Sequence, residues 1–324
     1  PSQAHSFVYT SIYKIQTTRN IPLSVEYLLS PIDRYSSPVR VDIKWNGELF
    51  RVEKFISPLP FHKQRVWTFH HPIKSQLLKK LRDKSVCSLG SIAYKISVGL
   101  KTTADNVFIK PMKLHLIKQQ GLESDLIFPI LESHNIRRWH CDWQRERDLY
   151  VLYPHQEQDG KVVPVCLDDY PNAKKYLMAH QKQLESRRYL SQSNRRWYEI
   201  WVHQSPVDFR CLKLITPDIA PDNCFALDDT QLFVNGTCFY IILKDQSLEH
   251  NLIILALLNS KVLEYFHKNT SGNVLYAKRF RYWTSYLNPY PIPDITHSKN
   301  ATLVKQLFEN TKILVESPAL KEAR

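Results

Sequence analysis

The chain has 324 residues, of which 43% are hydrophobic and 12% aromatic, enough for one large or two ordinary domains with substantial cores. Its longest apolar run, residues 252–258, is far shorter than the ~20 residues of a membrane span, so we expect no membrane segment. The six cysteines form no Cys-x-x-Cys pair, which argues against a zinc site and a disulfide framework and favours a reducing, cytoplasmic environment.

Positive charge is concentrated in the first third of the chain. Of the formal net charge of +13, residues 1–120 carry 19 Lys and Arg against 7 Asp and Glu, a net of +12. Residues 121–210 carry 13 against 13, and residues 211–324 carry 12 against 11. A surface evolved only for solubility does not require such segregation. The distribution therefore favours a polyanionic partner, nucleic acid or an anionic membrane face.

The N-terminal region, residues 6–69, is expected to be rich in β-structure. Apolar and polar residues alternate in SFVYTSIYKI, VRVDIKW and LFRVEKFI, and Asn46-Gly47 is a hairpin-type turn. The sequence begins at Pro1 rather than Met, which is typical of a piece of a longer protein.

The same region contains a nuclease-like array in IDRYSSPVRVDIK: Asp33, Asp42 and Lys44. Two carboxylates hold a divalent ion in such arrays, while the lysine positions the attacking water. The other interpretation is a solvated edge strand, because a carboxylate two residues from a lysine is common in β-segments. A metal-dependent nuclease is therefore the alternative function for this chain.

A short basic helix is expected to begin near Pro72, with its charge carried by Lys74 and by Lys79, Lys80, Arg82 and Lys84. Strand-like segments at 92–98, 106–110 and 149–153 then frame the stretch SVGLKTTADNVFIK, residues 97–110. A phosphate-binding loop needs a glycine directly before its lysine. Leu100 separates Gly99 from Lys101, so nucleotide binding by this motif is excluded.

The remaining elements alternate between helices and strands. A helix is expected over 172–190, and strands over 197–203, 210–215, 223–227 and 238–243. Residues 248–267 are apolar nearly all round, which is typical of a buried helix, and residues 299–315 form a last amphipathic helix.

Three clusters combine arginine or lysine with tryptophan. They are Arg137-Arg138-Trp139, Arg195-Arg196-Trp197, and Lys278-Arg279-Phe280-Arg281-Tyr282-Trp283. Arginine pairs with phosphate and with guanine edges, and aromatic rings pack on sugars and unstacked bases. Each cluster alone is weak evidence, because a tryptophan next to an arginine is often a buried core residue next to a surface residue. We expect the three tryptophans to pack beneath the arginines in this way. Together with the basic first third, the clusters favour nucleic-acid binding.

Catalytic motifs are missing from the sequence. It contains no G-x-S-x-G, H-E-x-x-H or G-x-G-x-x-G, and no glycine loop for S-adenosylmethionine. The Asn-Pro-Pro-aromatic run of amino-methyltransferases is also absent; its nearest match is Asn288-Pro289-Tyr290. We therefore expect no catalytic centre and no cofactor in this chain.

An ordered set of motifs nevertheless resembles a known family. GLKTTADNVFI, IFPILESHNIRRW, DLYVLYPH, YPNAKKYLMAHQKQLESR, WYEI, KLITPDIAP and NCFALDD are followed by ILALLNSKVLEYF, YAKRFRYWTSYL and PYPIPDI. This succession, over about residues 66–295, resembles the C-terminal target-recognition (specificity) domain of TaqI-like adenine-N6 DNA methyltransferases, including fused restriction–modification enzymes. In that family the glycine-lysine-threonine segment opens the recognition domain.

The resemblance implies an α+β fold with an irregular β-rich DNA-recognition lobe, packed helices and a C-terminal helical region. It implies a β-rich segment over 1–65 that leads to a missing methyltransferase domain, a target-recognition domain over 66–295 and an amphipathic helix over 296–324. The implied partners are double-stranded DNA and the N-terminal methyltransferase domain of the same longer bacterial protein, which binds S-adenosylmethionine and flips the adenine. We expect DNA contacts from charged and hydroxyl residues: Lys79, Lys80, Arg82, Lys84, Lys101, Thr102, Thr103, Arg137, Arg138, Arg195, Arg196, Lys278, Arg279 and Arg281.

Overall fold

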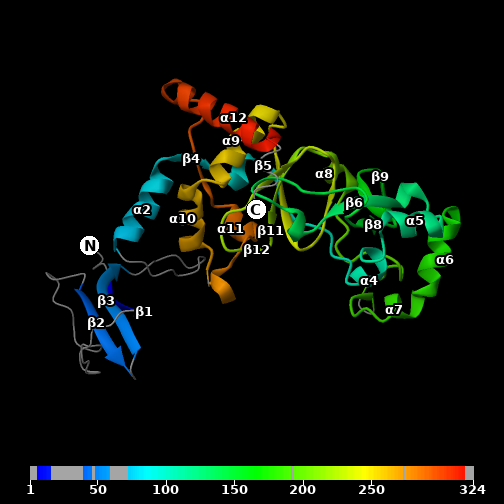
Figure 1. The fold of residues 1–324 in the computed structure, drawn as a ribbon, viewed down its shortest axis with the longest axis horizontal. Coiled ribbons are helices and arrows are strands. Elements are labelled where there is room, and N and C mark those ends of the chain that lie inside the picture. The colour runs from blue at the N-terminus through cyan, green and yellow to red at the C-terminus, as the bar shows by residue number, and fades with distance from the viewer. Residues whose placement is uncertain are drawn as a thin grey trace. The chain divides into compact units, whose positions relative to one another are not determined.

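The computed structural model describes residues 6–15, 39–45, 48–58, 72–190, 193–272 and 274–317. The chain divides into two compact units, Pro1–Lys84 and Ser85–Arg324 (Figure 1). Both α-helices and several small sheets are present, so the expected α+β class is confirmed. None of the helices in the described ranges combines the length and the apolar character needed to cross a membrane.

The smaller unit contains a three-stranded antiparallel sheet in the order β1-β3-β2. Its elements are β1 (Ser6–Ile15), β2 (Val39–Trp45), β3 (Glu48–Pro58) and the basic helix α2 (Pro72–Asp83). Trp45 pairs with Glu48, so a two-residue connection joins β2 to β3, as a hairpin turn requires. Asn46 and Gly47 themselves lie outside the described residues.

The larger unit is built around a five-stranded sheet in the order β5-β15-β11-β13-β7. Its strands are β5 (Ala93–Val98), β7 (Trp139–His140), β11 (Lys213–Pro217), β13 (Ala226–Asp228) and β15 (Cys238–Leu243). Neighbours are antiparallel except β13 and β7. A three-stranded sheet has the order β14-β6-β8, with β6 (Ile127–Leu131), β8 (Tyr150–Leu152) and β14 (Phe233–Val234).

Three two-stranded sheets complete the β-structure. They are β9 (His155–Gln158) with β10 (Lys161–Pro164), β12 (Ile219–Ala220) with β16 (Phe280–Arg281), and β4 (Ser85–Ser88) with β17 (Pro291–Pro293). The helices of this unit are α3 (Leu89–Ile92), α4 (Asp105–Phe108), α5 (Leu114–Gln120), α6 (Pro171–Ala179), α7 (Gln181–Glu185), α8 (Pro206–Arg210), α9 (Leu248–Leu258), α10 (Lys261–Thr270), α11 (Thr284–Leu287) and α12 (Ala301–Glu316).

Two expected strands are not strands. Residues 106–110 belong largely to α4, because the carbonyl of Ala104 accepts hydrogen bonds from the N–H groups of Val107 and Phe108. Residues 197–203 contain only an isolated bridge, between Val202 and Lys101. In the first place apolar residues fill core positions on a short helix, and in the second they fill core positions on irregular backbone, so in neither place do they pair in a sheet.

Two expected long helices are each broken into a pair. The helix over 172–190 becomes α6 and α7, which meet at His180. The helix over 248–267 becomes α9 and α10, separated by Asn259 and Ser260. The Asn259 side chain accepts a hydrogen bond from the Phe225 N–H and donates one to the Phe225 carbonyl, at 2.9 Å each. Ser260 caps the new helix by accepting from the Leu263 N–H at 3.2 Å.

A buried ion pair lies within the five-stranded sheet. Lys213 on β11 and Asp228 on β13 have fully buried side chains, with 2.5 Å between Nζ and Oδ2. The Lys213 ammonium also donates to the Phe209 carbonyl at 2.6 Å. Asp228 accepts further hydrogen bonds from the Thr230 N–H and hydroxyl and from the Leu232 N–H. The pair therefore ties the sheet to the turn that leads into β14.

Candidate functional site

The glycine of the GLKTT stretch permits close contact between two backbone segments. A methyl group at Gly99 would lie 2.3 Å from the carbonyl oxygens of both Val234 and Asn235. The next residue, Leu100, is buried and donates its N–H to the Val234 carbonyl at 2.7 Å. The glycine is thus required by packing of the chain on itself, and it leaves Lys101 at the surface.

The two threonines that follow have different positions. Thr102 is fully buried; its hydroxyl donates to the Asp105 side chain and accepts from the Ala104 N–H at 3.0 Å. Thr103 is exposed and has a left-handed φ of 57°. Thr102 therefore holds the start of α4, whereas Lys101 and Thr103 are accessible to a partner.

A short turn between β14 and β15, residues 235–237, contacts three segments: the GLKTT stretch, the segment that leads to Arg137, and the segment at Asp218. A methyl group at Gly236 would lie 2.6 Å from Cγ of Lys101, so these two residues touch. The Thr237 hydroxyl accepts from the Ser133 N–H at 3.2 Å, and the Thr237 carbonyl accepts from the Asp218 N–H at 2.8 Å. We call this segment the 235–237 turn. It lines an open cavity of about 580 Å³ together with residues 100–106 and Lys110.

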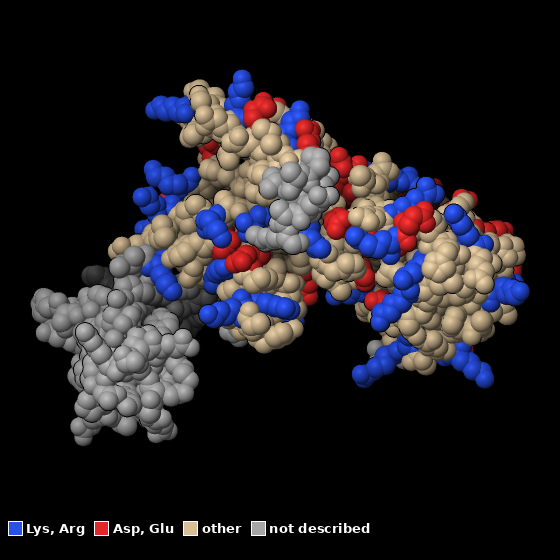
Figure 2. Space-filling model, in the orientation of Figure 1, with Lys and Arg blue, Asp and Glu red and all other residues tan. Residues whose placement is uncertain are grey.

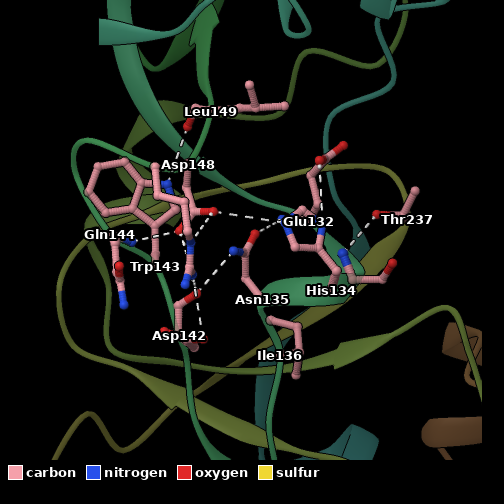
Figure 3. A network of polar contacts seen from close by, with 12 residues as sticks. Glu132, His134, Asn135, Ile136, Asp142, Trp143, Gln144, Asp148, Leu149 and Thr237 are labelled. Atoms are coloured by element: carbon pink, nitrogen blue, oxygen red, sulfur yellow. Dashed lines mark hydrogen bonds and ion pairs between the residues drawn. The ribbon is translucent and has the colours of Figure 1, made fainter.

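The loop over residues 132–148 is held by buried polar side chains (Figure 3). Asn135, 1% exposed, accepts from the Glu132 N–H at 2.9 Å and donates to the Asp142 carbonyl at 3.0 Å. Burial alone would raise the pKa of Asp148, but hydrogen bonds from Arg147 and the Gln144 N–H keep it below its usual range. A loop with its polar groups satisfied in this way is a rigid support for surface side chains.

Arg137 and Arg138, both in this loop, differ in whether a carboxylate lies near the guanidinium group. Arg137 is exposed and donates to two carbonyls, those of His134 at 2.5 Å and Ile136 at 3.2 Å. Arg138 donates to the Asn223 carbonyl at 3.0 Å and lies 3.7 Å from a carboxylate oxygen of Glu264. Trp139, on β7, pairs with Ala226 of β13 and is half-buried.

The second cluster is organised around Trp201, which the sequence did not single out. The ring of Trp201 is 41% exposed and lies 4.5 Å from the ring of Tyr189. Arg195 lies over the Trp201 ring at 5.5 Å and donates to the carbonyls of Trp201, at 2.7 Å, and Ile200, at 3.2 Å. Because Val202 is bridged to Lys101, this group adjoins the GLKTT stretch.

Arg196 faces a separate depression of about 640 Å³ that is also lined by Asp168, Lys174 and Tyr198. It donates to the Tyr198 hydroxyl at 2.7 Å and the Val165 carbonyl at 3.3 Å. Trp197 is partly buried and packs against the core, as expected.

In the third cluster Arg281 lies 4.9 Å from the Trp283 ring and forms an ion pair with Asp218, at 3.0 Å between Nη1 and Oδ2. Asp218 also contacts the 235–237 turn, so this cluster adjoins the same surface. The expectation that Trp283 is a core residue is wrong. Its ring is 41% exposed and stacks on Tyr286 at 5.9 Å, because residues 283–287 form a surface helical turn.

The contact candidates fall into two groups by charge compensation. In the described part of the chain, Arg138 and Arg281 have a carboxylate within 4 Å. Six others form no ion pair with a described carboxylate: Lys101, Arg137, Arg195, Arg196, Lys278 and Arg279. Figure 2 shows Lys and Arg side chains along the lower border of the larger unit, over α7 and over the segment beside β12 and α11. Uncompensated cations on a rigid support are the groups best suited to phosphate contacts.

The remaining candidates are placed as follows. Lys79, Lys80, Arg82 and Lys84 are exposed on or directly after α2, in the smaller unit. Asp33 lies outside the described residues, and Asp42 and Lys44 lie on β2. Among the residues that the structure describes, no three His, Cys, Asp or Glu side chains are grouped to hold a metal ion.

The nearest match to an amino-methyltransferase motif cannot receive a flipped base. Tyr290 is 0% exposed, and its ring packs edge-to-face on Phe266 at 5.9 Å and His267 at 5.7 Å. Adenine has no access to this ring, so Asn288-Pro289-Tyr290 does not fit an S-adenosylmethionine-dependent base site.

Charge compensation leads to a testable difference in salt dependence. For Arg195→Gln, the slope of log K for DNA binding against log salt is expected to become shallower by about 0.9, one phosphate contact. The matched control replaces both members of a neutral, exposed pair outside the predicted contacts, Lys174→Gln with Asp168→Asn, and is expected to leave the slope unchanged. Titrations at several salt concentrations measure both. An unchanged slope for Arg195→Gln would place Arg195 outside the interface.

Comparison with known proteins finds a matching family model and similar proteins. A family model, the TaqI-like C-terminal specificity domain, matches residues 128–292. The chain is 29% identical over 281 residues to the type II methyltransferase M.BanIII of Aneurinibacillus aneurinilyticus, with 84% of this chain and 48% of that protein covered. It thus spans about half the length of this curated relative.

The solved structures include the type IIG restriction endonuclease BpuSI, which is similar with a TM-score of 0.44 and 12% identity over 74% of this chain and 28% of that one. The family match extends from β6 to β17 and includes the 132–148 loop, the 235–237 turn and the third basic cluster. Because it covers half of the chain, the chain belongs to the TaqI-like C-terminal specificity domain family.

Proposed function

We propose that this chain selects the DNA sequence modified by an adenine-N6 methyltransferase of a bacterial restriction–modification system. The observation that carries the proposal is the family match over residues 128–292, a specificity domain by its description. The relative M.BanIII is a type II methyltransferase and is about twice as long as the aligned chain. We infer that a methyltransferase domain of the same longer protein binds S-adenosylmethionine and carries out the transfer.

The arrangement of side chains supports two roles in recognition, phosphate contact and base reading, carried by different basic residues. Lys101, Arg137 and Arg195 are uncompensated cations connected through the 235–237 turn and its neighbours, and phosphate contacts from them would orient the duplex. Arg281 is instead oriented by Asp218 and Trp283. A guanidinium held on two sides keeps a defined direction, which reading a guanine edge requires. In this proposal Arg281 reads a base.

The test is a selection from randomised duplex DNA with the full chain. We expect one short sequence to be enriched, and its affinity to fall steeply as salt is raised. The longer protein, supplied with S-adenosylmethionine, should methylate adenine N6 within that same sequence, whereas this chain alone should not. Equal retention of all sequences at every salt concentration would contradict the proposal.

The variant Arg281→Ala identifies the reading residue in the same experiment. Loss of a bidentate guanine contact is expected to cost about 1–3 kcal/mol and to relax the preference at one position only. A uniform weakening on every sequence would instead make Arg281 a phosphate contact.

A further inference from the structure

A turn with a strained backbone includes the first two residues of the third basic cluster. Ala277 and Lys278 have φ values of 55° and 54°, and the Arg279 N–H donates to the Tyr276 carbonyl at 3.4 Å. Positive φ at both central residues defines a type I′ turn, which strongly favours Asn-Gly and Asp-Gly. Among the described residues, Ala277 and Lys278 are the two consecutive non-glycine residues with positive φ. We call Tyr276–Arg279 the 276–279 turn.

The side chains of this turn face solvent. Tyr276 is 75% exposed, and Lys278 and Arg279 are exposed as well. The Arg279 guanidinium lies over the Tyr276 ring at 5.5 Å, so the two form one cation–aromatic unit. Neither Lys278 nor Arg279 forms an ion pair with a described carboxylate. An exposed aromatic ring with two uncompensated cations contributes nothing to the core.

The base of the turn is firmly attached to the domain. The Leu275 N–H donates to the Arg279 carbonyl at 2.8 Å, and the chain continues directly into β16, which pairs with β12. Arg281 on β16 forms the ion pair with Asp218. Backbone strain at an exposed tip above such an anchored base is typical of a functional site, where the surroundings maintain a geometry that the local sequence disfavours.

We propose that the 276–279 turn is a preformed recognition element that enters a groove of the target duplex, with Tyr276 and Arg279 acting together. The proposal rests on the proposed DNA-reading function. Stacking on Tyr276 restricts Arg279 while leaving its N–H groups available for a guanine edge, and the tyrosine ring packs against the neighbouring sugar or thymine methyl group. The left-handed turn is retained because it presents this pair without ordering a flexible loop on binding.

The experiment separates strain from recognition. Ala277→Gly removes the conflict between a side chain and positive φ, does not change charge and makes the turn flexible. We expect its Tm to equal or exceed that of the unchanged chain, and its affinity for the selected sequence to fall about five- to tenfold. Ala277→Asn tolerates positive φ while remaining restricted, so it should keep the affinity.

The chain offers a matched control at Asp159-Gly160, the turn between β9 and β10, where both φ values are also positive. Asp159→Gly introduces the same flexibility there, and its DNA affinity should equal that of Asp159→Asn, which removes the same negative charge without adding flexibility. Arg279→Ala and Tyr276→Ala should each relax the preference at one or two adjacent base pairs by about tenfold, while Tyr276→Phe should not.

The outcomes distinguish this inference from the function on which it rests. If the unchanged chain selects no sequence, the proposed function fails. If it selects a sequence and Ala277→Gly binds that sequence with unchanged affinity, the function stands and the recognition role of the turn is overturned. A lower Tm for Ala277→Gly would also overturn it, because the turn would then carry no strain.

Discussion

Replacing Gly99 by alanine is expected to lower the free energy of unfolding by about 3 kcal/mol, the upper part of the usual range for overpacking. The added methyl group would lie 2.3 Å from two carbonyl oxygens, those of Val234 and Asn235. Both belong to backbone, so no side chain can rotate away to relieve the contact. Thermal unfolding should show the loss as a Tm lower by about 6–12 °C.

The same substitution is expected to weaken DNA binding at temperatures where the variant is folded. The chain segments on either side of the contact carry Lys101 and the 235–237 turn, and any relief of the clash separates them. Gly160→Ala is the control, because a methyl group there meets no atom within 4 Å. Its φ of 71° makes alanine cost about 1 kcal/mol, with no change in binding. Equal effects of the two substitutions would contradict the role assigned to Gly99.

Replacing Asp228 by asparagine is expected to cost about 3–5 kcal/mol, because it leaves a buried ammonium without its counter-charge. Lys213 is 0% exposed, and its ammonium also donates a hydrogen bond to the Phe209 carbonyl. Chemical denaturation of the full chain measures the change. Lys174→Gln is the comparison: this lysine pairs with Asp168, but the two side chains are 42% and 74% exposed, so we expect a much smaller loss.

A second substitution tests whether the buried charge is the cause. Combining Asp228→Asn with Lys213→Met removes the uncompensated ammonium, so the double variant should be more stable than Asp228→Asn alone. The double variant could instead be less stable than the unchanged chain by the sum of the losses in the two single variants. In that case the hydrogen bonds from Thr230 and Leu232 to Asp228 would be the dominant contribution.

The fold class and the family were accessible from the amino-acid sequence. Short segments rich in apolar, β-branched and aromatic residues predict β5, β11 and β15, and the all-round apolar run predicts the buried helix α9. Such patterns depend on residues close together in the chain, which is the range that local sequence determines. The order of the motifs, from the GLKTT stretch to PYPIPDI, indicated the specificity-domain family that the comparison then confirmed.

Elements that depend on contacts between residues remote in the chain could not be predicted from the sequence in this way. The break at Asn259 exists because its side chain hydrogen-bonds to Phe225. Val107 and Phe108, which were expected in a strand, lie on the helix α4 and are buried in a core that includes residues remote in the chain. β-propensity measures how well a side chain fits a half-buried pleated surface, so it fails where no such surface is present.

For the candidate site, the sequence by itself determined which residues carry positive charge and which of them stand beside aromatic rings. Only the tertiary structure decided which of those charges is already neutralised. Arg138 meets Glu264 and Arg281 meets Asp218, whereas Arg195, among the described residues, meets carbonyls and a ring. Coulombic pairing depends on distances of a few ångströms between segments remote in the chain. Those distances, like the contact that explains Gly99, are set by the packing of the sheets and loops and not by the order of residues.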